Sequence, residues 1–466
     1  MKKNLFLAAG SLCFALLLCE GALRVAGAVF NASFFQGDTE RGWALRPNTE
    51  GWLIGETKNY RRINSDGLHD HEHSLAKPPH TMRIAVLGDS CTEGAEQPIE
   101  KTFVSVLGQQ LAHSPALGGK QVEVINFGVS GYGTAQELLT LRDHVWKYNP
   151  DIVLLAFYSG NDIFNNERDL NPSSGAAQCP YFVFRKDQLV LDDSFRHSPD
   201  LRKSAMWKQA VRAQIVNHSR VVQLIYSAWN AYRQRAAGQS VSANTTDLQP
   251  TNDQIYLPTK PNVKEAWRVT EFLLAMMNRE VRAHGAEFWL VSLWTSQQVS
   301  PDPARRQQFC QQLGLPNLSY PDLRLQELAT KQQIPLILLA PTVAAYTAEH
   351  NVYVNGGVLL PPGVGHFNEL GHRLAGTLIA SELASRSARI AGSASPITNT
   401  PQPPIACPVS TVAGSRSRIR RWTASRLDPA RAPKYSIANT LVFPHGRSGR
   451  RHHRGPERRP ALPRGL

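Results

Sequence analysis

Short apolar runs of strand length alternate with helix-like segments along the middle of this chain, and this alternation constrains its fold more than any other feature. Parallel strands need a long crossover between them, and a helix usually supplies it. The pattern therefore predicts an α/β protein, a three-layer α/β/α sandwich built on a parallel sheet. The predicted strands are Ile84–Leu87, Val122–Phe127, Asp151–Tyr158, Phe288–Leu293 and Ile334–Leu339, with a helix over Thr134–Tyr148.

Small polar residues follow the first three of these runs, at the points where the strands should end. The first run leads into Gly88-Asp89-Ser90, the second into the glycine-rich stretch 128–134, and the third into Ser159-Gly160-Asn161-Asp162. Ligands of open α/β sheets bind at the carboxyl ends of the strands. A serine there is a candidate nucleophile, and glycine N–H groups or an asparagine amide can stabilise an oxyanion.

A histidine suited to general-base work lies near the end of the predicted folded region. His366 precedes a segment in which apolar residues recur at helical spacing, and a helix is expected over Asn368–Ser385. His366 should therefore lie in a loop just before that helix. From such a loop an imidazole can accept the proton of a serine hydroxyl.

These segments, taken in order, resemble the SGNH (GDSL-type) hydrolase superfamily over roughly residues 80 to 390. Gly88-Asp89-Ser90 resembles its first block, residues 126–131 its second, Gly160-Asn161-Asp162 its third, and the segment 366–368 its fifth. Four blocks in the expected order and context are far more specific than any one of them. The resemblance implies a flavodoxin-like fold.

The same resemblance implies roles for individual residues. Ser90 would be the nucleophile and His366 its base, while the N–H groups of Ser90 and Gly131 and the amide of Asn161 would form the oxyanion hole. The implied activity is hydrolysis of acyl esters, acetyl esters among them, through a covalent acyl-enzyme. Lipid or glycan esters of the cell envelope are the expected substrates, and neither a metal nor an organic cofactor is expected.

Two other functions stay open at this point. An O-acyltransferase acting on envelope polysaccharide or lipid would use the same covalent step, with a hydroxyl group replacing water. A catalytically inactive envelope-binding protein could keep the fold without the chemistry.

One departure from the family pattern bears on activity. The family usually carries an aspartate three residues before its histidine, and here that position is Gly363. The acid orients the imidazole, and its loss from a triad can cost about four orders of magnitude in rate. Three arrangements are open: a Ser90–His366 dyad whose imidazole donates to a backbone carbonyl, an acid from elsewhere such as Asp302, or an inactive site.

Several polar residues near these motifs have simpler interpretations than catalysis. Asp89 is expected to shape its turn, and Asp162 to satisfy loop backbone. His372 is expected to lie on the last helix as a surface or packing residue. The histidine-rich tract 69–73 is expected to be an exposed loop in preference to a metal site.

Charge is distributed unevenly along the chain. The net charge is +14 over 466 residues. Residues after 390 contribute +12 of it, because they include 14 basic residues and only two acidic ones, Asp428 and Glu457. The remainder is nearly neutral, so no nucleic-acid partner is expected. The expected partners are a small-molecule, glycan or lipid ester and a membrane. The sequence leaves the oligomeric state open.

The N-terminus indicates export. Two lysines precede an apolar run from Leu5 to Cys19, as in a signal peptide or signal anchor. If Glu20 and Arg24 pair, the helix could continue to about residue 29 and span a bilayer. An uncleaved anchor is favoured, with the catalytic part outside the cytoplasm, in the periplasm or cell envelope.

The predicted organisation has four parts. Residues 1–29 form the anchor or signal peptide, 30–79 an N-terminal extension, and 80–390 the hydrolase-like domain. Within that domain, 163–262 is an insertion that could act as a lid. The basic segment 391–466 contains too little apolar surface to fold and is expected to be disordered.

Overall fold

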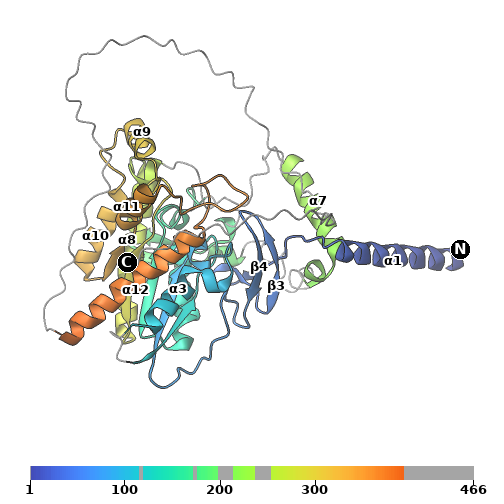
Figure 1. Ribbon diagram of the computed structural model, residues 1–466, viewed down its shortest axis with the longest axis horizontal. Helices are drawn as coiled ribbons and strands as arrows, with labels where there is room; N and C mark the ends of the chain where they lie inside the picture. The colour runs from blue at the N-terminus through green and yellow to red at the C-terminus, as the bar shows by residue number, and fades with distance from the viewer. Residues whose placement is uncertain (1, 115–118, 172–175, 198–213, 237–252, 393–466) are drawn as a thin grey trace, which may run out of the picture. The chain divides into compact units, whose positions relative to one another are not determined.

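The computed structural model describes residues 2–114, 119–171, 176–197, 214–236 and 253–392 (Figure 1). The chain divides into two units, one that includes Met1–Val29 and one that runs from Phe30 to Asp428. The predicted tail lies outside the described residues, apart from its first two positions, and so does part of the 163–262 insertion.

The first unit contains helix α1, Lys2–Val25. It is long and apolar enough to cross a membrane, and a signal sequence would meet the same criteria. Arg24 Nε donates to Glu20 Oε1 over 2.7 Å, as the i,i+4 spacing predicts.

A five-stranded parallel sheet forms the centre of the second unit. The strand order is β11-β10-β7-β5-β6, and every neighbouring pair is parallel. Numbered along the chain this is the 2-1-3-4-5 order of flavodoxin-like folds, so the predicted fold class is confirmed. The strands are β5 (Thr81–Gly88), β6 (Gln121–Asn126), β7 (Ile152–Phe157), β10 (Glu287–Ser292) and β11 (Leu336–Leu338).

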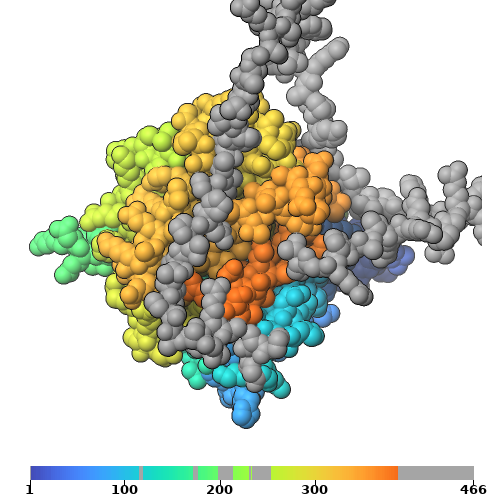
Figure 2. All heavy atoms as spheres, turned by 60° about the vertical axis from the view of Figure 1, so that its left-hand side comes forward, coloured from blue at the N-terminus to red at the C-terminus, as the bar shows by residue number. Residues whose placement is uncertain are grey.

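Helices cover both faces of the sheet because side chains alternate along each buried strand. In β5, Ile84 and Val86 pack under α3 (Phe103–Ala112), α11 (Ala340–His350) and α12 (Glu369–Gly392). Ala85 and Leu87 face α4 (Thr134–Asp143), α8 (Pro261–Ala283) and α10 (Tyr320–Gln332). Figure 2 shows α12 in orange beside α3 in cyan, on the outside of the helix layer that also contains α11. Helix α9, Pro303–Leu313, precedes α10.

The helix predicted over Thr134–Tyr148 is shorter than expected. Helix α4 ends at Asp143, and a 3₁₀ turn over Val145–Tyr148 follows. Asn149 then takes the left-handed conformation with φ 49°, a conformation that asparagine tolerates at helix ends.

The described parts of the insertion include a hairpin and a helix. Strands β8 (Tyr181–Arg185) and β9 (Gln188–Asp192) pair antiparallel. Their two turn residues, Lys186 and Asp187, have φ of 49° and 62°, which suits a tight hairpin turn. Helix α7 spans Arg220–Ala236.

Two hairpins make up the N-terminal extension. The first joins β1 (Phe35–Asp38) to β2 (Gly42–Leu45), and the second joins β3 (Thr49–Ile54) to β4 (Lys58–Ile63). Alternate residues of β4 are buried. Among them, Arg61 forms a buried ion pair with Glu93, at the end of the short helix α2 (Ser90–Glu93). The second hairpin is thereby fixed to the segment that carries Ser90.

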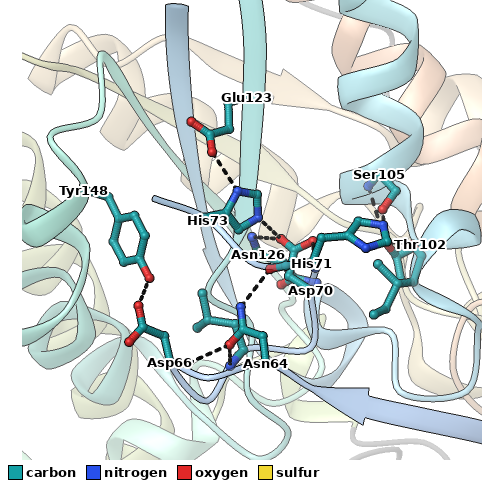
Figure 3. A network of polar contacts seen from close by, with 12 residues as sticks. Asn64, Asp66, Asp70, His71, His73, Thr102, Ser105, Glu123, Asn126 and Tyr148 are labelled. Carbon is teal, nitrogen blue, oxygen red and sulfur yellow. Dashed lines mark hydrogen bonds and ion pairs between the residues drawn. The ribbon is translucent and has the colours of Figure 1, made fainter. Parts of the chain in front are cut away.

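The expectation of an exposed loop over the histidine-rich tract is confirmed at His71 and Glu72 but is wrong at its start, where His69 and Asp70 are buried. His69 is 1% exposed, and its Nδ1 lies 2.7 Å from the carbonyl oxygen of Glu93. His73 lies between Glu123 and Asp70, at 2.7 and 3.2 Å (Figure 3). Burial lowers the pKa of His73, but the two carboxylates more than offset it and the pKa is raised. The two histidines thereby connect this loop to the end of α2 and to β6.

A buried carboxyl group on α10 makes stability depend on pH. Asp322 accepts hydrogen bonds from Ser292 Oγ (2.6 Å) and Gln298 Nε2 (2.9 Å). Burial outweighs these bonds and raises its pKa from 3.8 to about 6. The folded state thus keeps a proton that the unfolded state releases, so stability should fall by about 3 kcal/mol as the pH rises from about 4 to 6.

Asp322→Asn should remove that slope. Urea unfolding of both proteins between pH 4 and 7 measures it, and parallel pH profiles for the two proteins would contradict this assignment.

Candidate active site

Ser90 lies directly after the central strand β5, as the first residue of α2. Asp89 caps this helix, and its carboxylate accepts a hydrogen bond from the N–H of Cys91 over 2.9 Å. Asp89 therefore shapes the turn, as predicted. Ser90 is 2% exposed, so the residue is buried at the end of the strand.

The two loops that carry the expected oxyanion donors end at the same edge of the sheet, because β6 and β7 flank β5. The N–H of Val129 donates to the carbonyl oxygen of Gly88 over 3.2 Å, which ties the glycine-rich loop to the strand before Ser90. Gly131 has φ 80°, a conformation that favours glycine.

Asn161 lies in the turn after β7, and its side-chain amide is buried. Its side chain is 1% exposed, and within the described part of the chain neither amide atom has a hydrogen-bond partner. Its neighbour Asp162 accepts from the N–H of Tyr158 over 2.7 Å, so it satisfies loop backbone as predicted. A buried amide without a partner is costly unless a ligand supplies one.

His366 reaches Ser90 from the other end of the chain. It lies in the loop before α12, and its Nε2 is 2.8 Å from Ser90 Oγ. Its carbonyl oxygen accepts from the N–H of Gly356 over 2.8 Å, so both the backbone and the ring have fixed partners.

The carboxylate that contacts His366 comes from the N-terminal extension. Glu56 Oε1 is 2.8 Å from His366 Nδ1, and Glu56 Oε2 accepts the backbone N–H of His366 over 2.7 Å. Because a carboxylate only accepts hydrogen bonds, Nδ1 carries the proton and Nε2 is left to accept the Ser90 hydroxyl. Glu56, His366 and Ser90 thus form one continuous hydrogen-bonded chain.

Glu56 occupies the turn of the β3–β4 hairpin, and several bonds hold that turn against the loop after α2. Thr57 Oγ1 donates to the carbonyl oxygen of Glu96 over 2.8 Å. Asn59 Nδ2 donates to the carbonyl oxygens of Ala95 and Gln97 over 3.0 and 2.8 Å. The extension is therefore a structural part of the site.

A second carboxylate lies beside the first. Glu96 Oε1 is 3.4 Å from His366 Nδ1. Burial raises the pKa of Glu96, and the charge of Glu56 raises it further, while His366 and Arg61 lower it. Glu56, Glu96 and His366 are also the group in the described residues whose ligand atoms, all within 4.8 Å of one another, could hold a metal ion. A metal ion bound there would replace the proton that lies between His366 Nδ1 and Glu56.

The local backbone explains why the acid does not come from position 363. Gly363 has φ 81°, and a Cβ there would lie 2.7 Å from the ring of Tyr353. An aspartate would therefore be strained as well as crowded. Of the three arrangements that the sequence leaves open, the structure agrees with the second, in which the acid comes from elsewhere in the chain. The carboxylate that contacts His366 Nδ1 is that of Glu56.

Asp302 is the wrong candidate for this acid. It caps α9, where its side chain accepts from the N–H of Ala304 over 2.9 Å. Sequence reasoning missed Glu56 because it lies in a turn between two strands, outside every motif.

His372 packs inside the protein on α12. It is fully buried, its Nδ1 accepts the N–H of Phe103 over 3.1 Å, and burial, together with repulsion from His366, lowers its pKa to about 3. It is a neutral packing residue, as the sequence suggests.

No family model matches the chain. A curated relative from Vibrio mimicus is 37% identical over 73 residues, which cover 16% of this chain and 34% of the relative. That relative is an arylesterase. The chain thus matches about a third of its length.

Several solved structures match the chain with TM-scores from 0.30 to 0.32. An acetyl xylan esterase is 14% identical, with a TM-score of 0.31, and the match covers 66% of this chain and 99% of that one. A lipase/acylhydrolase from Enterococcus faecalis is 16% identical, with a TM-score of 0.32 and coverage of 66% and 96%. A protein titled as a putative lipolytic protein of the G-D-S-L family, from Desulfitobacterium hafniense, is 12% identical, with a TM-score of 0.30 and coverage of 65% and 99%.

Proposed function

We propose that this protein is a serine esterase of the SGNH (GDSL) type that hydrolyses acyl esters through a covalent acyl-enzyme. The observation that carries the proposal is the hydrogen-bonded chain from Ser90 through His366 to Glu56, with contacts of 2.8 Å at both ring nitrogens. A nucleophile, a base and an acid that orients the base are the three parts that such catalysis needs.

The reaction follows from this arrangement. His366 Nε2 takes the proton of Ser90 as Oγ attacks the ester carbonyl, and the imidazolium is stabilised by Glu56. The tetrahedral intermediate collapses when Nε2 gives this proton to the leaving alcohol. Water then attacks the acyl-enzyme, with His366 again accepting and returning a proton, and the carboxylic acid leaves.

The oxyanion is assigned to three donors: the N–H groups of Ser90 and Gly131 and the side-chain amide of Asn161. The unpartnered amide of Asn161 supports this assignment, because an oxyanion would supply the acceptor that its N–H groups lack.

The acyl group of the proposed substrate is apolar and binds on the side of the site that carries His366. The loop before His366 exposes Val358 (91%), Leu359 (51%) and Val364 (49%). Leu359 N–H donates to the carbonyl oxygen of Glu56 over 2.9 Å, so this loop adjoins the acid. Lipid or glycan esters of the cell envelope are the substrate class we propose, with α1 as anchor or export signal.

The test is covalent labelling of the full chain by a fluorophosphonate probe, alongside hydrolysis of p-nitrophenyl acetate and butyrate. We expect turnover and a phosphonyl adduct that peptide mass spectrometry locates on Ser90. Ser90→Ala should lose both the adduct and turnover. His366→Ala should lose turnover and label far more slowly.

The outcomes separate the alternatives. An adduct on Ser90 without hydrolysis would contradict the esterase and favour an acyltransferase that lacks its acceptor. Neither an adduct nor turnover in a protein with a normal unfolding transition would favour a binding protein.

A further inference from the structure

Helix α7 carries an apolar face that no other described element covers. Leu224, Ile225, Trp229 and Tyr232 are 39, 61, 54 and 65% exposed. Their spacing places them, with the exposed Ala228, on one side of the helix. Exposed apolar stripes of this size on a single helix mark an interaction site more often than a bare surface.

The other side of the helix is buried near its start. Gln223 is 2% exposed, and its side chain accepts from Arg220 Nη1 (2.8 Å) and donates to the carbonyl oxygen of Asn217 (3.3 Å). Val216, just before α7, is 4% exposed. The buried side therefore leaves the apolar stripe facing away from the protein body.

The start of this segment is bonded to the chain just after α1. Asn217 Oδ1 accepts the N–H of Ser33 over 2.8 Å, and Asn217 Nδ2 donates to the carbonyl oxygen of Ser33 over 3.2 Å. Ser33 follows Val25, the last residue of α1, by eight positions. Eight residues span at most about 28 Å, so a membrane-inserted α1 would keep α7 within reach of the bilayer surface at any angle between them.

The composition of the segment matches a lipid surface. Residues 214–236 contain three arginines and no aspartate or glutamate. Trp229 and Tyr232 lie with ring centroids 5.9 Å apart on the apolar stripe. Aromatic residues of this kind concentrate at membrane interfaces, and arginines attract anionic headgroups.

We propose that α7 lies flat on a bilayer containing anionic lipids, with Leu224, Ile225, Trp229 and Tyr232 inserted among the upper acyl carbons. The helix and α1 then form two contacts with the same membrane, which fixes the orientation of the body. The idea goes beyond the proposed esterase and does not depend on its activity.

Trp229 itself provides the test, because α1 contains no tryptophan. The full chain is reconstituted into vesicles of phosphatidylcholine and phosphatidylglycerol, with or without bromine at carbons 6 and 7 of the acyl chains. Subtracting the emission of Trp229→Phe isolates the signal of Trp229. We expect brominated lipid to quench this signal, and Leu224→Ser/Ile225→Ser to lose the quenching.

Leu323→Ser is the matched control, since Leu323 is 49% exposed on α10, away from the stripe, and its loss should leave the quenching unchanged. Equal Trp229 emission in both kinds of vesicle would overturn the proposal. So would a dimer that dissociates in the double variant without any quenching, because a second copy would then cover the stripe. Urea unfolding of each variant checks the fold independently of catalysis, so failure of esterase activity leaves the quenching result intact.

Discussion

Glu56→Gln is expected to lower kcat for p-nitrophenyl acetate by about three to four orders of magnitude, with little change in KM. The amide keeps the size of the side chain and can still accept one hydrogen bond from His366. It lacks the negative charge that stabilises the imidazolium and no longer enforces a proton on Nδ1. Steady-state kinetics at several pH values measure the loss.

Glu96→Gln is the matched control for this variant. Glu96 lies 3.4 Å from the same nitrogen, compared with 2.8 Å for Glu56. If Glu56 orients the base, the Glu96 variant should retain most of its activity. A larger loss from Glu96→Gln than from Glu56→Gln would assign the acid to Glu96 instead. Urea unfolding of both variants separates a catalytic loss from a folding defect.

Position 363, where the resembled family usually carries its aspartate, offers a further test of which residue acts as the acid. Gly363→Asp combined with Glu56→Gln should not restore activity, because an aspartate at φ 81° would meet the ring of Tyr353. Restored turnover would mean that the loop can accommodate the usual acid, and that the argument from Tyr353 and the positive φ is wrong.

The central fold could be predicted because the information is local. Strands such as Ile84–Leu87 are buried on both faces and appear as continuous apolar runs between turn residues. The helix ends were harder to predict. The break after Asp143 depends on how His144 and Asn149 close the turn, and periodicity does not show it.

The site could be predicted only where sequence motifs carry it. Ser90, Gly131 and Asn161 follow three neighbouring strands, so the sheet order alone brings them to one edge. Glu56 lies 310 positions from His366, in a hairpin turn with ordinary turn composition. Its approach depends on tertiary contacts, such as those of Thr57 and Asn59, that leave no periodic signal. The burial of His69 and Asp70 was missed for the same reason.

Asn161→Ala should lower kcat by about two to three orders of magnitude, equivalent to about 3 kcal/mol of transition-state stabilisation. The stability of the folded protein, in contrast to kcat, is not expected to decrease. Because the amide is buried without a partner in the described part of the chain, removing it deletes no hydrogen bond and relieves a desolvation cost, so Tm should not fall. A merely structural asparagine would show the reverse, a lower Tm with kcat preserved.

Asn161→Asp sharpens the same argument. The carboxylate is almost isosteric with the amide but offers no N–H, and its charge repels a developing oxyanion. We expect a loss in kcat at least as large as that of the alanine variant, easing at low pH as the carboxyl group becomes protonated and able to donate. Equal activity of Asn161→Asp and the parent at neutral pH would remove Asn161 from the oxyanion hole and leave that work to the N–H groups of Ser90 and Gly131.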